Sequence, residues 1–62
     1  MNLEYLKLKI NESVFSNEEL AEMIGVSRAT FFNYKSNKND IPVQKLDKLI
    51  KILNLDLNEL FK

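Results

Sequence analysis

Residues 16–31, SNEELAEMIGVSRATF, decide the fold, because two helix starts and one helix stop fall within this short stretch. Ser16 and Glu19 have the spacing of a capping box, in which each side chain accepts a hydrogen bond from the other residue's amide. Gly25, the only glycine in the chain, suits the left-handed conformation that ends many helices. Ser27 suits the N-cap of a following helix. The stretch therefore predicts two short helices joined by a tight turn.

The apolar residues of this region predict how the two helices pack. Leu20, Ala21 and Ile24 form one stripe on the first helix, and Ala21 is small where the helices would cross closely. The second helix, expected from about Arg28 to Ser36, turns Phe31 and Tyr34 inward. Its outward residues are then Arg28, Ala29, Phe32 and Asn33. In a helix-turn-helix, the recognition helix inserts its outward face into the major groove of DNA, and these residues are placed for that role.

The segment before this motif has two readings. Leu3, Leu6 and Ile10 fall on one helical stripe, whereas Leu6, Leu8 and Ile10 alternate with lysines as in a strand. We predict a helix over residues 3–12, because leucine, lysine and glutamate are good helix formers and no partner strand is evident. A short terminal strand is the alternative.

The segment after the motif predicts two more helices. Asn37 closes the recognition helix and a polar loop follows as far as Ile41. Pro42 suits a helix start, and Asn54 ends that helix. Asp56, with a glutamate three residues later, is an N-cap signal for a short last helix over residues 57–61.

These elements predict an all-α, compact five-helix domain over residues 1–62, in which the second and third helices form a helix-turn-helix. The predicted core consists of apolar residues from all five helices and from the turn: Leu6, Ile10, Leu20, Ala21, Ile24, Val26, Phe31, Tyr34, Val43, Leu46, Leu49, Ile50, Leu53, Leu57 and Leu60.

Composition excludes several classes of function. The chain has no cysteine and no histidine, so it forms no disulfide and lacks the usual zinc ligands. Glu18, Glu19 and Glu22 resemble a catalytic or metal cluster only by proximity in sequence, since one caps a helix and the others face solvent. With no nucleophile–base pair and one glycine, we expect no enzymatic activity, metal or cofactor. No apolar run spans a bilayer or resembles a signal peptide, which favours the cytoplasm and no membrane partner.

Charge is distributed unevenly along the chain. The net charge is zero, which is low for a protein that binds nucleic acid. Residues 28–51 nevertheless carry six basic and two acidic side chains, a net charge of +4, between two acidic flanks. One face of the domain can therefore attract phosphate despite the neutral total.

The stretch 16–31 resembles the phage repressor and Cro type of helix-turn-helix, the XRE-like family. The resemblance extends through the polar loop and the next helix to the ending NLDLNELF at residues 54–61. It departs from the family at Val14 and Asn37, where glycine is usual, and at Asn17, where glutamine is frequent. The resemblance implies a small Cro-like transcription regulator that binds double-stranded operator DNA as a dimer.

The same resemblance implies which residues contact DNA. Base contacts fall on the outward positions of the recognition helix: Ser27, Arg28, Ala29, Phe32 and Asn33. Arginine can donate two hydrogen bonds to guanine, asparagine can pair with adenine, and apolar side chains can touch a thymine methyl group. Backbone contacts fall at the helix ends and in the loop: Asn17, Thr30, Lys35, Lys38 and Asn39.

Two further expectations concern protein partners. The dimer surface is expected near the end of the chain, at Leu55, Leu57 and Phe61. The alternative function is that of a protein-interaction module, such as an antitoxin or a small partner that inactivates a repressor. The neutral charge and the outward Phe32 support this alternative.

Overall fold

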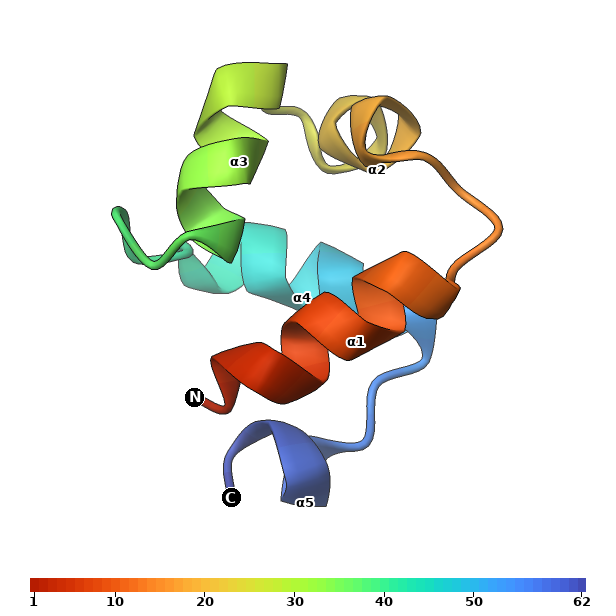
Figure 1. The fold of residues 1–62 in the computed structure, drawn as a ribbon, viewed down its shortest axis with the longest axis vertical. Helices are drawn as coiled ribbons and strands as arrows, with labels where there is room; N and C mark the ends of the chain where they lie inside the picture. Colours follow the sequence, from red (N-terminus) through yellow and green to blue (C-terminus); the bar gives the residue numbers. More distant parts are fainter.

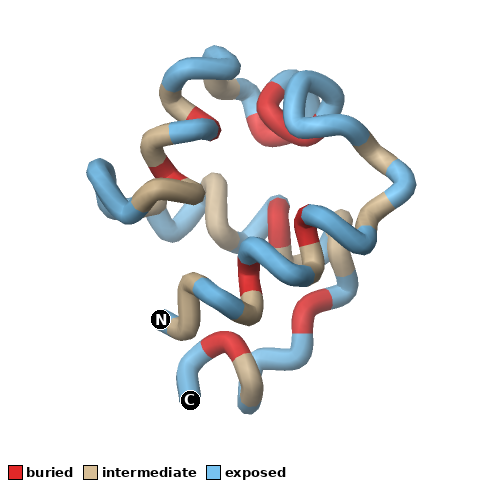
Figure 2. The backbone as a smooth tube through the Cα atoms, viewed as in Figure 1, coloured by how far each residue is buried: buried red, intermediate tan, exposed pale blue.

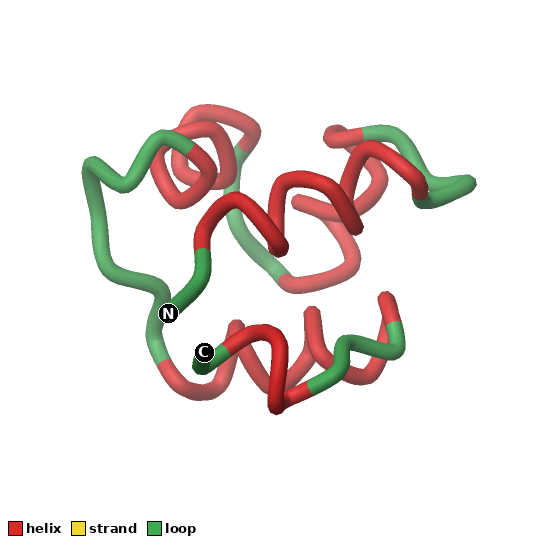
Figure 3. The backbone as a smooth tube through the Cα atoms, turned by 60° about the horizontal axis from the view of Figure 1, so that its bottom comes forward, coloured by secondary structure: helices red, strands yellow, loops and turns green.

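The computed structural model describes residues 1–62, which form five α-helices and no strand (Figures 1 and 3). The helices are α1 (Leu3–Glu12), α2 (Asn17–Ile24), α3 (Arg28–Lys35), α4 (Val43–Leu53) and α5 (Leu57–Leu60). The all-α class and the helix-turn-helix of α2 and α3 are thus confirmed. The strand alternative for the first segment is wrong. None of the five helices combines the length and apolar character that crossing a membrane requires.

Polar side chains cap the starts of four helices. At α2, the Ser16 hydroxyl accepts from the Glu19 amide at 3.1 Å, and the Glu19 carboxylate accepts from the Ser16 amide at 3.0 Å. This is the predicted capping box. Ser27 caps α3, while Asn2 and Asp56 cap α1 and α5. Local side-chain chemistry therefore fixes where these helices begin.

Left-handed residues end the three central helices: Gly25 with φ of 81°, Asn37 with 60° and Asn54 with 52°. After α2, the Gly25 amide donates to the carbonyl of Glu22 at 3.1 Å, and the Val26 amide donates to the carbonyl of Ala21 at 2.9 Å. These two bonds form a Schellman motif, which turns the chain sharply out of one helix and toward the next.

Replacing Gly25 by valine should destabilise the domain by more than about 1 kcal/mol, because a β-branched residue is strained at positive φ. In a domain of this size the melting temperature should fall by roughly 4–8 °C for each kcal/mol. Gly25→Asn is the matched control, since asparagine tolerates this conformation and also introduces a Cβ atom 3.3 Å from the Lys45 ammonium. Equal melting temperatures for the wild type and Gly25→Val would contradict the assigned strain.

The core lies between the five helices, each of which contributes at least one buried residue (Figure 2). Its ten buried residues are all apolar or aromatic: Leu6, Ile10, Leu20, Ala21, Ile24, Phe31, Tyr34, Leu49, Leu55 and Leu60. Nine of these were predicted from the sequence. Four other predicted core residues are half-buried and pack against this cluster: Val26, Leu46, Ile50 and Leu53.

Two predicted core residues, Val43 and Leu57, are exposed instead. Val43 is 82% exposed, although it continues the apolar stripe of α4. It occupies the first turn of α4, where no other helix covers it. Leu57 likewise opens α5, whose buried residue is Leu60. Helical periodicity places both residues in line with buried positions of their helices. It does not show whether another helix covers them.

Leu55, expected at a dimer surface, is instead part of the core. The reason is the turn after α4, in which the Leu55 amide donates to the carbonyl of Ile50 at 3.0 Å beside left-handed Asn54. An apolar residue at this position of a Schellman-type turn packs back onto its own helix. Leu55 is therefore not available to a partner.

The two ends of the chain are fastened to each other. The Asn2 amide donates to the carbonyl of Leu60, and the Asp56 amide donates to the Tyr5 hydroxyl at 2.8 Å. α1 and α5 pack together, and both termini lie at the end of the molecule away from α2 (Figure 1). The surface of α2 and α3 that faces solvent is therefore clear of the termini.

Candidate nucleic-acid interface

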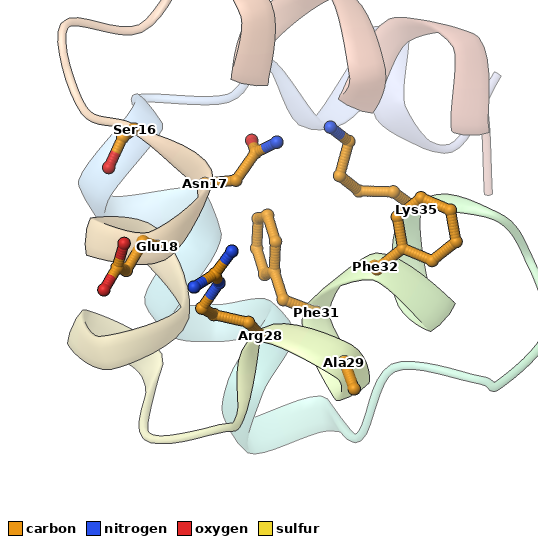
Figure 4. Close-up of a pocket in the computed structure, with 8 residues that line it drawn as sticks. All are labelled: Ser16, Asn17, Glu18, Arg28, Ala29, Phe31, Phe32 and Lys35. Carbon is orange, nitrogen blue, oxygen red and sulfur yellow. The ribbon is translucent and has the colours of Figure 1, made fainter.

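A groove of about 460 Å³ separates the start of α2 from the outward face of α3 (Figure 4). Its lining comes from both helices: Ser16, Asn17, Glu18, Arg28, Ala29, Phe31, Phe32 and Lys35. Five of these eight were predicted as DNA contacts, three for bases and two for the backbone. The buried Phe31 ring lies at the bottom, where it joins the groove to the core.

α3 and the following loop carry cations that form no ion pair. Arg28, Lys35 and Lys38 are the charged residues of the segment 28–39, which contains no aspartate or glutamate. The three ion pairs of the structure lie elsewhere and join Lys9 to Glu12, Lys51 to Asp47 and Lys62 to Glu59. The positive charge of this segment is therefore available to an external anion.

Arg28 is placed against the preference of its helix. It is the first residue of α3, and the first turn of that helix contains no acidic residue. The positive end of the helix dipole disfavours a cation at this position. Arg28 is exposed, and its guanidinium extends into the groove toward α2 (Figure 4). Its position favours binding to an external acceptor over stabilising the helix.

Ser27 and Thr30 are joined to each other by their hydroxyl groups. The Ser27 hydroxyl accepts from the Thr30 amide at 3.1 Å and donates to the Thr30 hydroxyl at 2.9 Å. The Ser27 hydroxyl therefore has Thr30 as its partner in both hydrogen bonds, which weakens Ser27 as a base-reading residue. The Thr30 hydroxyl keeps its own proton, which it can donate to a phosphate oxygen.

The other predicted base contacts differ in exposure. Ala29 and Phe32 line the groove, and Phe32 is 60% exposed. Asn33 is half-buried and lies outside the groove lining. Lys38 and Asn39 are exposed in the loop after α3 and also lie outside the groove. The structure thus brings together most of the predicted base contacts and places the loop residues beyond one end of α3.

The start of α2 supplies the other wall of the groove. Asn17 is exposed and is the first residue of α2, so its backbone amide has no carbonyl partner within the helix. The capping box satisfies the Glu19 amide and leaves those of Asn17 and Glu18 without a partner in the helix. Free amides and the helix dipole favour an anion here.

Sequence reasoning did not assign Glu18 to this site. The first turn of a helix is a favourable place for any carboxylate, so the sequence alone gives no reason to assign Glu18 a role in binding. Only the packing of α2 beside α3 brings Glu18 into the groove with Arg28 and Lys35. The sequence feature that could have identified Glu18 is its position next to Asn17, a predicted DNA contact.

Leu57, the first residue of α5, and Phe61, the residue that caps its end, are two exposed apolar side chains outside the groove lining. Leu57 and Phe61 are both more than half exposed, and the Phe61 amide donates to the Leu57 carbonyl at 3.0 Å. They are four residues apart, about one helical turn, a spacing that brings two side chains close together. This pair retains the exposure that a docking surface requires.

The family comparison agrees with this arrangement. A family model described as helix-turn-helix, of the XRE-like type, matches residues 4–60, which is nearly the whole chain. No curated protein and no solved structure matches the chain. The matched region contains every buried residue of the core and every residue that lines the groove. The chain therefore belongs to the XRE-like helix-turn-helix family of DNA-binding transcription regulators.

Proposed function

We propose that this domain is a Cro-like regulator that binds double-stranded operator DNA sequence-specifically, with α3 in the major groove. The observation that carries the proposal is that Arg28 and Lys35 line one groove without ion pairs, and that Lys38, also unpaired, follows in the loop after α3. The neutral total charge makes the binding depend on this local surface.

Base recognition is assigned to the outward face of α3. Arg28 binds guanine O6 and N7 with two donors, and Asn33 pairs with adenine N6 and N7. Ala29 and Phe32 contact thymine methyl groups, because they are the exposed apolar residues of this face. Ser27 contributes little to base recognition, since its hydroxyl is committed to the helix cap.

Backbone contacts are assigned to both sides of this face. Asn17 binds phosphate at the start of α2, where free amides support an anion. Thr30 donates its hydroxyl proton, while Lys35, Lys38 and Asn39 follow the strand that passes the end of α3. These contacts set the position of α3 on the duplex without selecting a sequence.

Selection from a random pool of duplexes tests the proposal directly. The wild-type protein should enrich one short sequence, and its affinity for that duplex should exceed its affinity for a scrambled duplex. A titration at several salt concentrations should show a shallow dependence, because each protomer has few cations. If no duplex is retained above background at low salt, the function proposed here is wrong.

We further propose that two copies bind the operator together. One recognition helix reads only a few base pairs, and a two-fold dimer would place two half-sites about 34 Å apart. Leu57 and Phe61 are the candidate contact surface, as an exposed apolar pair outside the DNA-facing groove.

Phe61→Ser should convert a two-protomer complex into a one-protomer complex and weaken operator binding. Phe61 is 58% exposed, so the substitution should leave the fold intact. Leu8→Ser is the matched control, because Leu8 is 54% exposed on α1. Sedimentation velocity of the free proteins and of their complexes measures the stoichiometry. A wild-type complex with one protomer on an intact operator would contradict the dimer.

The second candidate function is a protein-interaction module, such as an antitoxin or a partner that inactivates a repressor. Phe32 favours it, since a 60% exposed aromatic ring is more useful against an apolar partner than in water. The same duplex selection separates the two candidates, because an interaction module would enrich no sequence.

A further inference from the structure

Glu18 is the only carboxylate in the lining of the groove, and it shares that groove with Arg28. Figure 4 shows the Arg28 guanidinium extending toward the wall from which Glu18 projects. Neither residue takes part in any of the three ion pairs of the structure. A surface that should attract phosphate thus has an anion beside its principal base-reading cation.

Helix stability gives Glu18 only a secondary role, because Glu19 already supplies the cap of α2. The capping box of α2 is formed by Glu19, and Glu18 is exposed with no side-chain hydrogen bond. Both glutamates lie in the first turn, so Glu18 only adds to a favourable dipole interaction that Glu19 already provides. Its place in the groove therefore calls for a role in binding.

The chemistry of the guanidinium group supplies that role. Arginine has five N–H donors in a planar fork, and guanine accepts from two of them. The remaining donors can bind a carboxylate while the guanine contact is in place. A phosphate in the same position would instead meet the negative charge of Glu18 at close range. Glu18 is therefore compatible with guanine binding by Arg28 and opposes phosphate binding by Arg28.

We propose that Glu18 is a specificity-determining positioning residue, which holds the Arg28 guanidinium toward a guanine and keeps it from neighbouring phosphates. This inference rests on the proposed function, in which Arg28 reads a base. It assigns to Glu18 a reduction in affinity for non-operator DNA and an increase in the preference for guanine at one position.

The test uses the duplex that the wild-type protein selects from a random pool, together with the same duplex changed at each base pair in turn. Glu18→Gln keeps the size and polarity of the side chain and removes its charge. Its affinity for scrambled DNA should rise about threefold to tenfold at low salt. Its preference for guanine at the position read by Arg28 should fall about fivefold.

Glu22→Gln is the matched control, because it removes the same charge from an exposed residue of α2 that does not line the groove. It should leave the guanine preference unchanged. The combination of Glu18→Gln with Arg28→Ala should show no loss of preference beyond that of Arg28→Ala alone. Melting curves of all variants should be close to that of the wild type.

Three results would each overturn the inference: an unchanged guanine preference in Glu18→Gln, an equal loss in Glu22→Gln, or an equal loss from Glu18→Gln when Arg28 is absent. These results all require a wild-type protein that selects a sequence. A wild-type protein that retains no duplex at low salt overturns the proposed function as well, so the two failures are distinguishable.

Discussion

Phe31→Ala is expected to remove about 3–5 kcal/mol from the free energy of unfolding, because a fully packed aromatic side chain is replaced by a cavity. Phe31 is 1% exposed and belongs to the central cluster. A domain of 62 residues has a total stability of roughly 3–9 kcal/mol, so most of it would be lost. Urea unfolding followed by circular dichroism should show a much lower midpoint or no folded baseline at room temperature.

The adjacent residue provides the control for this prediction. Phe32→Ala makes the same chemical change at a position that is 60% exposed, and its effect should stay within about 0.5 kcal/mol. A similar loss of stability in both variants would mean that α3 packs on the core through a different face from the one described.

Arg28→Ala should cost roughly 1–3 kcal/mol in binding to the selected duplex and little in binding to scrambled DNA. The variant should discriminate less at one base pair, because a two-donor contact with guanine is lost. Its folding should not suffer, since the helix dipole disfavours a cation at the first residue of α3. Binding titrations on both duplexes measure the difference.

Lys38→Ala provides the contrast to this second prediction. Lys38 is exposed in the loop after α3, so its removal should weaken binding to both duplexes alike. It should also reduce the salt dependence by about one counterion per protomer. If operator affinity is unchanged in Arg28→Ala, or if both variants lose affinity for both duplexes equally, base reading by Arg28 is wrong.

The helix boundaries could be predicted from sequence because they depend on neighbouring residues. Ser16 and Glu19 satisfy each other's amides within one turn, and Gly25 adopts a conformation that other residues resist. Such signals require no knowledge of the rest of the fold. The same local chemistry identified Asn54 and Asp56 at the last turn and the last helix.

Burial at the ends of helices could not be predicted in the same way. Val43 and Leu57 have suitable periodicity, yet each is the first residue of its helix and is exposed. Leu55 is expected on the surface because it lies near Leu57 and Phe61 at the end of the chain, whereas the turn geometry folds it back onto α4. Burial at these positions depends on where other helices stop, which a single sequence does not contain.

The candidate site was predictable along one helix and less so across two. Arg28 and Phe32 could be identified because the spacing of Phe31 and Tyr34 fixed which face of α3 points inward. Glu18 could not be identified from the sequence, because its place in the groove depends on how closely the start of α2 approaches α3. Residues that act together from different elements are found only once those elements are placed.

The fastening of α1 to α5 also bears on the order in which a newly made chain folds. The bond between Asp56 and Tyr5 joins residues 51 positions apart, whereas α2 and α3 are neighbours in sequence. The helix-turn-helix pair can therefore form from local contacts while synthesis continues. α1 is synthesised first but gains its partner α5 last, so the nascent protein keeps part of its apolar surface uncovered until residues 55–60 have been added.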